Sequence, residues 1–189
     1  MTPTLPASGS ALVLIDIQVG FDDPEWGARN NPDAEDVCGR LLEAWRRNGW
    51  PVVHIQHDST EPDSSLAPGS PGHAHKSQVA PQADEPVLHK TVNSAFIGTD
   101  LEQRLREMAV PGVVFCGLTT DHCVSTTTRM SANLGFDTWL VADGCATFAR
   151  QGPDGQLFAA TLVHDVALAS LHEEFATVLH STDLLTAGD

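Results

Sequence analysis

Residues 113–124 of the chain read VVFCGLTTDHCV. This segment gives the clearest indication of the fold, and the other segments are interpreted in relation to it. The β-branched and aromatic start of this segment, which ends at Gly117, is typical of a buried strand. The Thr-Thr-Asp sequence that follows supplies residue types that cap helices. The segment therefore predicts a strand, a tight turn and a helix with Cys123 in its first turn.

A cysteine at that position has an unusual chemical environment. Cys123 would lie among unpaired backbone N–H groups at the positive end of the helix dipole, which favours the thiolate over the thiol. The same N–H groups can hold an oxyanion on an atom that the sulfur attacks. The turn thus predicts a nucleophile together with its stabilising group. The alternative is an ordinary buried cysteine, as free cysteines often are.

The same alternation of apolar runs and amphipathic segments extends along the whole chain. It predicts an α/β fold, an open and mostly parallel sheet with helices on both faces in three layers, as one domain over residues 1–189. His164 and His172 are expected at the surface or as capping residues. Besides 113–117, the expected strands are 11–15, 51–56, 86–89, 137–141 and 176–179, and the expected helices are 33–48, 100–108, 123–134 and 158–175.

Two further reactive side chains stand where expected strands end. Asp16 follows the strand 11–15, and Lys90 follows the strand 86–89. In open α/β sheets ligands bind at the carboxyl ends of the strands, so both residues are expected beside Cys123. The lysine would stabilise a thiolate while the carboxylate accepts and returns a proton, which is the chemistry of acyl transfer through a thioester. Taken singly, Asp16 could instead cap a turn and Lys90 could be solvated.

Composition excludes several classes of partner. Ten basic against 25 acidic residues give a formal charge of −15, which disfavours an extended surface for nucleic acid or anionic lipid. No apolar run approaches the roughly 20 residues that span a bilayer. The four cysteines form no CxxC pair, and residues 1–10 do not resemble a signal peptide, so we expect a cytoplasmic protein with reduced thiols.

Residues 59–86 are rich in Pro, Gly, Ser and His and predict an excursion over the surface that could act as a lid. The only candidate metal cluster in the sequence lies in and before this excursion, at His57, Asp58, His73 and His75. Its spacing matches no common zinc pattern. We therefore expect no metal and no cofactor.

Taken together, three strings of sequence carry a family resemblance. The chain resembles the isochorismatase-like cysteine hydrolases, a superfamily that includes nicotinamidases, N-carbamoylsarcosine amidohydrolase, and ureidoacrylate and biuret hydrolases, from residue 11 to about residue 185. The strings are ALVLIDIQ at 11–18 with Phe21, Lys90 with SAF at 94–96, and CGLTTDHCV at 116–124 with Thr127 and Arg129.

The resemblance implies a catalytic set of Asp16, Lys90 and Cys123. It also implies an oxyanion hole made by the backbone N–H groups of Thr119 and Cys123, and a non-proline cis peptide just before Thr119. A homodimer or larger assembly, with pocket walls shared between subunits, is a further implication.

The chain differs from two members of the superfamily, isochorismatases proper and nicotinamidases, and these differences narrow the expected activity. Isochorismatases proper cleave a vinyl ether and lack the cysteine, so Cys123 favours an amidase. The Asp-x-His metal motif of nicotinamidases would fall on His57 and Ser59, which leaves no metal site in register. We expect hydrolysis of the C–N bond of a small, flat, neutral or cationic amide, imide or carbamoyl compound. The expected substrate-binding residues are Phe21, Trp26, His57, Phe96 and His122.

Two other functions fit the same sequence. In one, the protein is a thiol-reactive or redox protein in which Cys123 is oxidised and Cys116 or Cys145 resolves it. In the other, it is a binding module that keeps the pocket without turnover.

Overall fold

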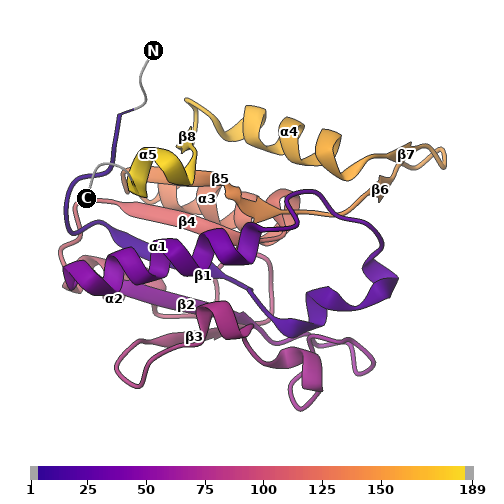
Figure 1. The fold of residues 1–189 in the computed structure, drawn as a ribbon, viewed down its shortest axis with the longest axis horizontal. Coiled ribbons are helices and arrows are strands. Elements are labelled where there is room, and N and C mark those ends of the chain that lie inside the picture. The colour runs from indigo at the N-terminus through magenta and orange to yellow at the C-terminus, as the bar shows by residue number, and fades with distance from the viewer. Residues whose placement is uncertain (1–3, 186–189) are drawn as a thin grey trace.

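The computed structural model describes residues 4–185, which gather around one six-stranded sheet (Figure 1). Its strand order is β3-β2-β1-β4-β5-β8, and every neighbouring pair is parallel. The expectation of an open, parallel α/β sheet is confirmed. The strands are β1 Ala11–Ile15, β2 Val52–His57, β3 Val87–Lys90, β4 Val113–Leu118, β5 Thr138–Ala146 and β8 Thr177–Leu179.

Both faces of the sheet are buried, as the continuous apolar run of β1 requires. Leu12 and Leu14 pack into one core with side chains of α1 (Ala34–Asn48) and α5 (Ser181–Leu185). Val13 and Ile15 point the other way, into a core shared with α2 (Leu101–Glu107) and α4 (Ala160–Leu171). The helix α3 (Ser125–Asn133) lies on this second side, against α4 and β5. Figure 1 shows α1 crossing the strands on its own face.

The helix α1 follows its sequence signals closely. Val37, Leu41 and Trp45 are buried along one side of it. It ends at Gly49, which adopts the left-handed conformation with φ +65° and donates its N–H to the carbonyl of Arg46.

The last third of the chain differs from expectation. β5 runs to Ala146 rather than 141, because a bulge in its pairing with β4 lets Gly117 pair with Cys145. The predicted helix 158–175 spans only Ala160–Leu171. The chain before it forms the antiparallel hairpin of β6 (Arg150–Gln151) and β7 (Leu157–Phe158), and α5 was not expected.

The excursion 59–86 is tied to the loop after β1. The short 3-10 helices in these segments are η1 (Val19–Asp22), η2 (Pro24–Trp26), η3 (Pro71–His73) and η4 (Ser77–Val79). The Lys76 N–H donates to the carbonyl of Ile17 at 3.0 Å. The Lys76 ammonium, which is buried, lies 2.5 Å from Asp22 and 2.6 Å from Glu35 of α1. Backbone pairing and buried charge therefore fix the excursion to α1 and to the loop after β1.

Among residues 4–185, no helix is long and apolar enough to cross a bilayer.

Candidate active site

The topology places a crevice between β1 and β4. From β1 the chain proceeds to β2 and β3 on one side, and it then returns to build β4, β5 and β8 on the other. Such a switch point leaves an opening at the carboxyl ends of the two strands. Asp16 follows β1 at this point, and the π-helical turn Thr120–Val124, labelled η5, follows β4.

Backbone geometry brings the two strand ends unusually close. Gly117 pairs with Ile15 and has φ +131°, and a Cβ atom at this position would lie 2.0 Å from the Ile15 carbonyl oxygen. Only glycine fits there. Asp16, the residue directly after β1, adopts φ +50°, a left-handed conformation that is uncommon for non-glycine residues. The Leu118–Thr119 peptide bond is cis, as the resemblance implied.

The structure brings the three expected reactive groups together. The Lys90 Nζ donates to Asp16 Oδ2 at 2.6 Å and lies 3.4 Å from Cys123 Sγ. Asp16 is 0% exposed, Lys90 1% and Cys123 9%, so Cys123 is the most accessible residue of the three.

The charge state of the thiol differs from the expectation. Burial and the neighbouring Asp16 carboxylate raise the pKa of Cys123 to about 12, outweighing the Lys90 ammonium, which lowers it. Burial also raises the pKa of Asp16, against the effect of Lys90. The Lys90 ammonium lies closer to Asp16 Oδ2 than to Cys123 Sγ, which favours the negative charge on the carboxylate and a protonated resting sulfur. This differs from the resting thiolate that the sequence predicts.

The local helix geometry is also not the one expected. Cys123 lies in the π-helical turn that precedes α3, not in the first turn of an α-helix. The carbonyl of Thr119 accepts the N–H groups of both His122 and Val124. This reduces the number of free N–H groups from which the helix-dipole expectation was built.

His57 completes the surroundings of the lysine. Its Nδ1 lies 3.1 Å from Lys90 Nζ. The side chain of Gln18, which is 0% exposed, accepts the His57 N–H at 2.8 Å and donates to its carbonyl at 3.1 Å. The string 11–18 ends at Gln18, two residues after Asp16, but the sequence alone indicates no role for this side chain.

A second missed residue is Asn93, whose Oδ1 lies 3.8 Å from Cys123 Sγ. The only sequence signal for it is its place three residues after Lys90.

The expected aromatic pocket residues fall into two groups. Phe21 and Trp26 pack on one another and on Phe148, with ring centroids 5.3 to 6.3 Å apart. Phe96 stacks on Phe136 at 6.1 Å, in the other core. The side chain of His122 is 54% exposed and lies 3.4 Å from Asp121. Whether these four residues bind substrate stays a prediction.

The histidines of the excursion do not form the cluster that the sequence suggested. His57 faces Lys90, and His75 instead packs edge-on against His54. Asp58 Oδ1 lies 2.7 Å from His73 Nε2 and 3.0 Å from His89 Nδ1. These three could offer a metal one ligand atom each, within 4.8 Å of one another.

The hydrogen bonds of Asp58, His73 and His89 indicate a structural role for these three residues. Both imidazoles use the same Asp58 oxygen, and the Gln56 amide nitrogen lies 3.4 Å from the second ring nitrogen of His73. A ring nitrogen that accepts there leaves His73 Nε2–H to donate to Asp58. The trio therefore links the ends of β2 and β3 to the excursion.

His164 corrects another expectation. It is buried rather than at the surface, and its Nδ1 lies 2.9 Å from the Thr120 hydroxyl, so it supports the turn that carries Cys123.

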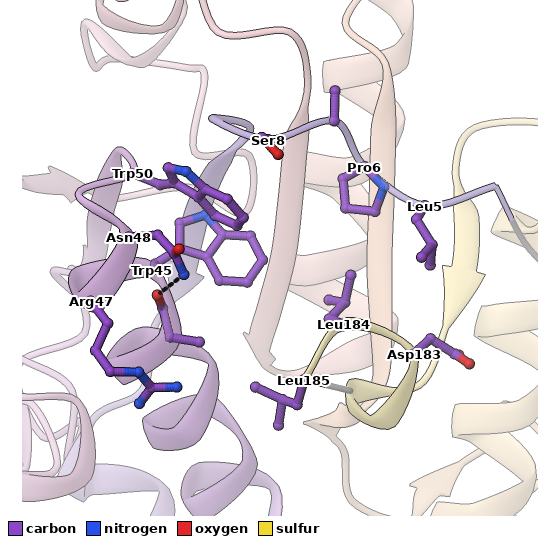
Figure 2. A pocket seen from close by; sticks show the side chains of 12 residues that line it. Leu5, Pro6, Ser8, Trp45, Arg47, Asn48, Trp50, Asp183, Leu184 and Leu185 are labelled. Atoms are coloured by element: carbon purple, nitrogen blue, oxygen red, sulfur yellow. Dashed lines mark hydrogen bonds between the residues drawn. The ribbon is translucent and has the colours of Figure 1, made fainter. Parts of the chain in front are cut away.

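A hollow of about 220 Å³ lies elsewhere, beside the amino ends of β1 and β2. Figure 2 shows Trp45 and Trp50 on one side of it and Leu184 and Leu185 on the other. It is remote from the carboxyl edge where Asp16 and Cys123 meet, so we do not assign the chemistry to it.

A parallel sheet with a thiol, an ammonium and a carboxylate at its switch point is the architecture of an α/β enzyme. Residues 10–183 match the Isochorismatase domain, and the chain belongs to the isochorismatase family of hydrolases.

Two similar proteins cover nearly the whole chain, and a third covers about three quarters of it. An uncharacterized isochorismatase family protein of Bacillus subtilis, YrdC, is 48% identical over 93% of this chain and 94% of its own length. An isochorismatase-family crystal structure from Chromobacterium violaceum superposes with a TM-score of 0.94 at 46% identity, covering 99% of this chain and 98% of the other. A streptothricin hydrolase of Streptomyces noursei is 35% identical over 73% of this chain, which spans 54% of that protein.

Proposed function

We propose that this hydrolase cleaves a C–N bond of a small non-peptide amide, imide or carbamoyl compound through a thioester on Cys123. The observation that carries the proposal is the buried Lys90 ammonium, held between the Asp16 carboxylate at 2.6 Å and the Cys123 sulfur at 3.4 Å. Lys76 is also buried beside carboxylates, but Lys90 in addition lies beside a thiol, and this placement is explained by a task at the sulfur.

The first half-reaction forms the acyl-enzyme. Asp16 takes the thiol proton as Cys123 Sγ attacks the carbonyl carbon, and the Lys90 ammonium stabilises the negative charge that develops on sulfur. The backbone N–H groups of Thr119 and Cys123 would hold the oxyanion. When the tetrahedral intermediate collapses, Asp16 returns the proton to the leaving nitrogen and the thioester remains.

The second half-reaction reverses these roles. Asp16 takes a proton from a water molecule, whose oxygen attacks the thioester carbonyl. The sulfur then leaves and regains its proton from Asp16. The raised pKa of Asp16, caused by burial, suits a carboxyl group that must both accept and return a proton near neutral pH.

The relatives support the coarser part of this proposal. The family is one of hydrolases, and the name of the Streptomyces noursei relative gives streptothricin as what that protein hydrolyses. Cys123 and its two partners are the reason for proposing a C–N bond in this chain rather than a vinyl ether.

The redox alternative requires a second thiol that can reach Cys123. Cys116 and Cys145 are both 0% exposed, and burial raises the pKa of Cys145 well above its ordinary value. A thiol of this kind is a poor resolving group, which favours the hydrolase.

The test is ammonia release from a panel of small amides, imides and carbamoyl compounds. We expect wild-type turnover, with or without a chelator, and none with Cys123→Ala. Cys38→Ser is the matched control, because Cys38 is a buried thiol in the other core that donates to the Gly144 carbonyl at 3.1 Å, and serine keeps the donor. Turnover that survives in Cys123→Ala would contradict the proposal.

A further inference from the structure

The donors and acceptors around Lys90 match in number. An ammonium has three protons and no lone pair. Three acceptors face Nζ: Asp16 Oδ2 at 2.6 Å, His57 Nδ1 at 3.1 Å and Cys123 Sγ at 3.4 Å. Because Nζ can only donate, the Nδ1 atom of His57 must present its lone pair. The proton of the neutral imidazole is therefore on Nε2.

Charge supports the same protonation state. A proton on Nδ1 would remove the hydrogen bond and put a second cation against Lys90. Burial and the Lys90 charge lower the pKa of His57, as does nearby His73, while Asp16 and Asp58 raise it and do not outweigh them. His57 is thus neutral at physiological pH.

The Gln18 side chain fixes the position of the His57 imidazole by holding its backbone. Gln18 bonds both the N–H and the carbonyl of His57, which holds the last residue of β2 as a neighbouring strand would. A ring nitrogen of His57, either Nδ1 or Nε2, lies within 4.8 Å of Cys123 Sγ and of an Asp16 carboxylate oxygen, so the imidazole ring borders the reactive group. Among residues 4–185 His57 Nε2 has no hydrogen-bond partner, and it is not one of the buried unpaired atoms, so solvent reaches it.

We propose that His57 is a specificity-determining residue, a fixed Nε2–H donor that selects amides with a second hydrogen-bond acceptor beside the scissile carbonyl. The acceptor is a carbonyl or carboxylate oxygen, as in imides, ureido compounds and diamides. The proposal rests on the proposed function, because it places the substrate carbonyl at Cys123. It also disfavours substrates that place a cationic group at this position, since the partial positive charge of the Nε2–H would face that group.

The first test needs no substrate. Long-range proton–nitrogen NMR of ¹⁵N-histidine-labelled wild-type protein reports which ring nitrogen carries the proton, with His57→Gln to assign the signal. We expect a neutral His57 protonated on Nε2. In Lys90→Met the donor is gone, and His57 should show a mixture of tautomers and titrate at higher pH. A wild-type His57 protonated on Nδ1, or on both nitrogens at neutral pH, would overturn the proposal whatever the enzyme's turnover.

The second test measures selectivity with two probes of the same size. Malonamide carries the second acceptor, whereas 3-methylbutanamide replaces it with methyl groups. Binding is followed by protection of Cys123 from iodoacetamide. We expect wild type to prefer malonamide by about 2- to 12-fold, the net effect of one hydrogen bond to a donor that solvent reaches in the free enzyme.

Substitutions of His57 distinguish the effect of its N–H donor from the effect of its packing. His57→Leu should abolish the preference, while His57→Gln, which keeps an N–H donor, should retain part of it. His89→Gln is the control, because His89 bonds Asp58 and not Lys90. Malonamide that binds wild type no better than 3-methylbutanamide would overturn the proposal. A preserved preference, with no ammonia release from malonamide or from any compound of the amide panel, would instead refute the proposed function and leave His57 as a binding determinant.

Discussion

Replacing Asp16 with asparagine tests the buried ion pair on which the site depends. The side chains of Asp16 and Lys90 are both 0% exposed and lie 2.6 Å apart. Asparagine keeps the shape but removes the anion, so the Lys90 ammonium is left buried and uncompensated. Breaking such a pair costs about 3 to 5 kcal/mol of the free energy of unfolding. At about 2 to 4 °C per kcal/mol for a chain of this size, Tm should fall by roughly 6 to 20 °C.

The double variant Asp16→Asn/Lys90→Met is the control. Methionine fills the lysine stem without a charge, so the double variant should recover most of the lost stability. Urea and thermal unfolding can be followed by the fluorescence of the four tryptophans. A Tm for Asp16→Asn within about 2 °C of wild type, or a double variant no more stable than the single one, would refute the reasoning. The Asp16 carboxyl group would then carry the proton in the resting enzyme.

Three further variants test other parts of the site and its support. Since the Asp16 charge raises the pKa of Cys123, Asp16→Asn should react faster with iodoacetamide than wild type while losing turnover, and slower labelling would contradict this. The Arg29 and Lys76 partners outweigh burial and lower the pKa of Glu35 from 4.5 to about 2, so stability is lost as pH falls through that window. Glu35→Gln should lose less there in urea unfolding, and equal losses would be the contrary result. Gly117→Ala, with its Cβ 2.0 Å from the Ile15 carbonyl, should not reach a native circular dichroism spectrum, whereas a wild-type Tm would show that the strands can separate.

Sequence patterns were sufficient for the sheet and for the residues at its carboxyl edge. β1 and β4 are apolar on both faces, and each is followed directly by a reactive segment. Because parallel strands end at one edge, the positions of Asp16, Lys90 and Cys123 in the chain already placed them together.

The charge state of Cys123 could not be predicted in the same way. The pKa of the thiol depends on how deeply the rest of the fold buries it and on which of two anions the single ammonium supports. The local signal, a cysteine after capping residues, indicated a thiolate. Burial by distant segments reversed that prediction.

The directions of individual side chains could not be predicted from the sequence either. A sequence lists His57 but not the direction of its ring, which depends on Lys90 and on the Gln18 side chain. The same holds for His164, whose place behind Thr120 is set by the packing of α4 against η5. The extension of β5 depends on a bulge opposite Gly117, a feature of strand pairing rather than of either strand.

The most direct test of the central claim is mass spectrometry of the enzyme quenched during turnover of the best compound in the amide panel. We expect the peptide that contains Cys123 to gain the mass of the acyl fragment, and this adduct to disappear as substrate is consumed. The Cys123→Ala protein should show neither adduct nor ammonia. Steady turnover by wild type with an unmodified Cys123 peptide, together with turnover by Cys123→Ala, would contradict a covalent cysteine mechanism.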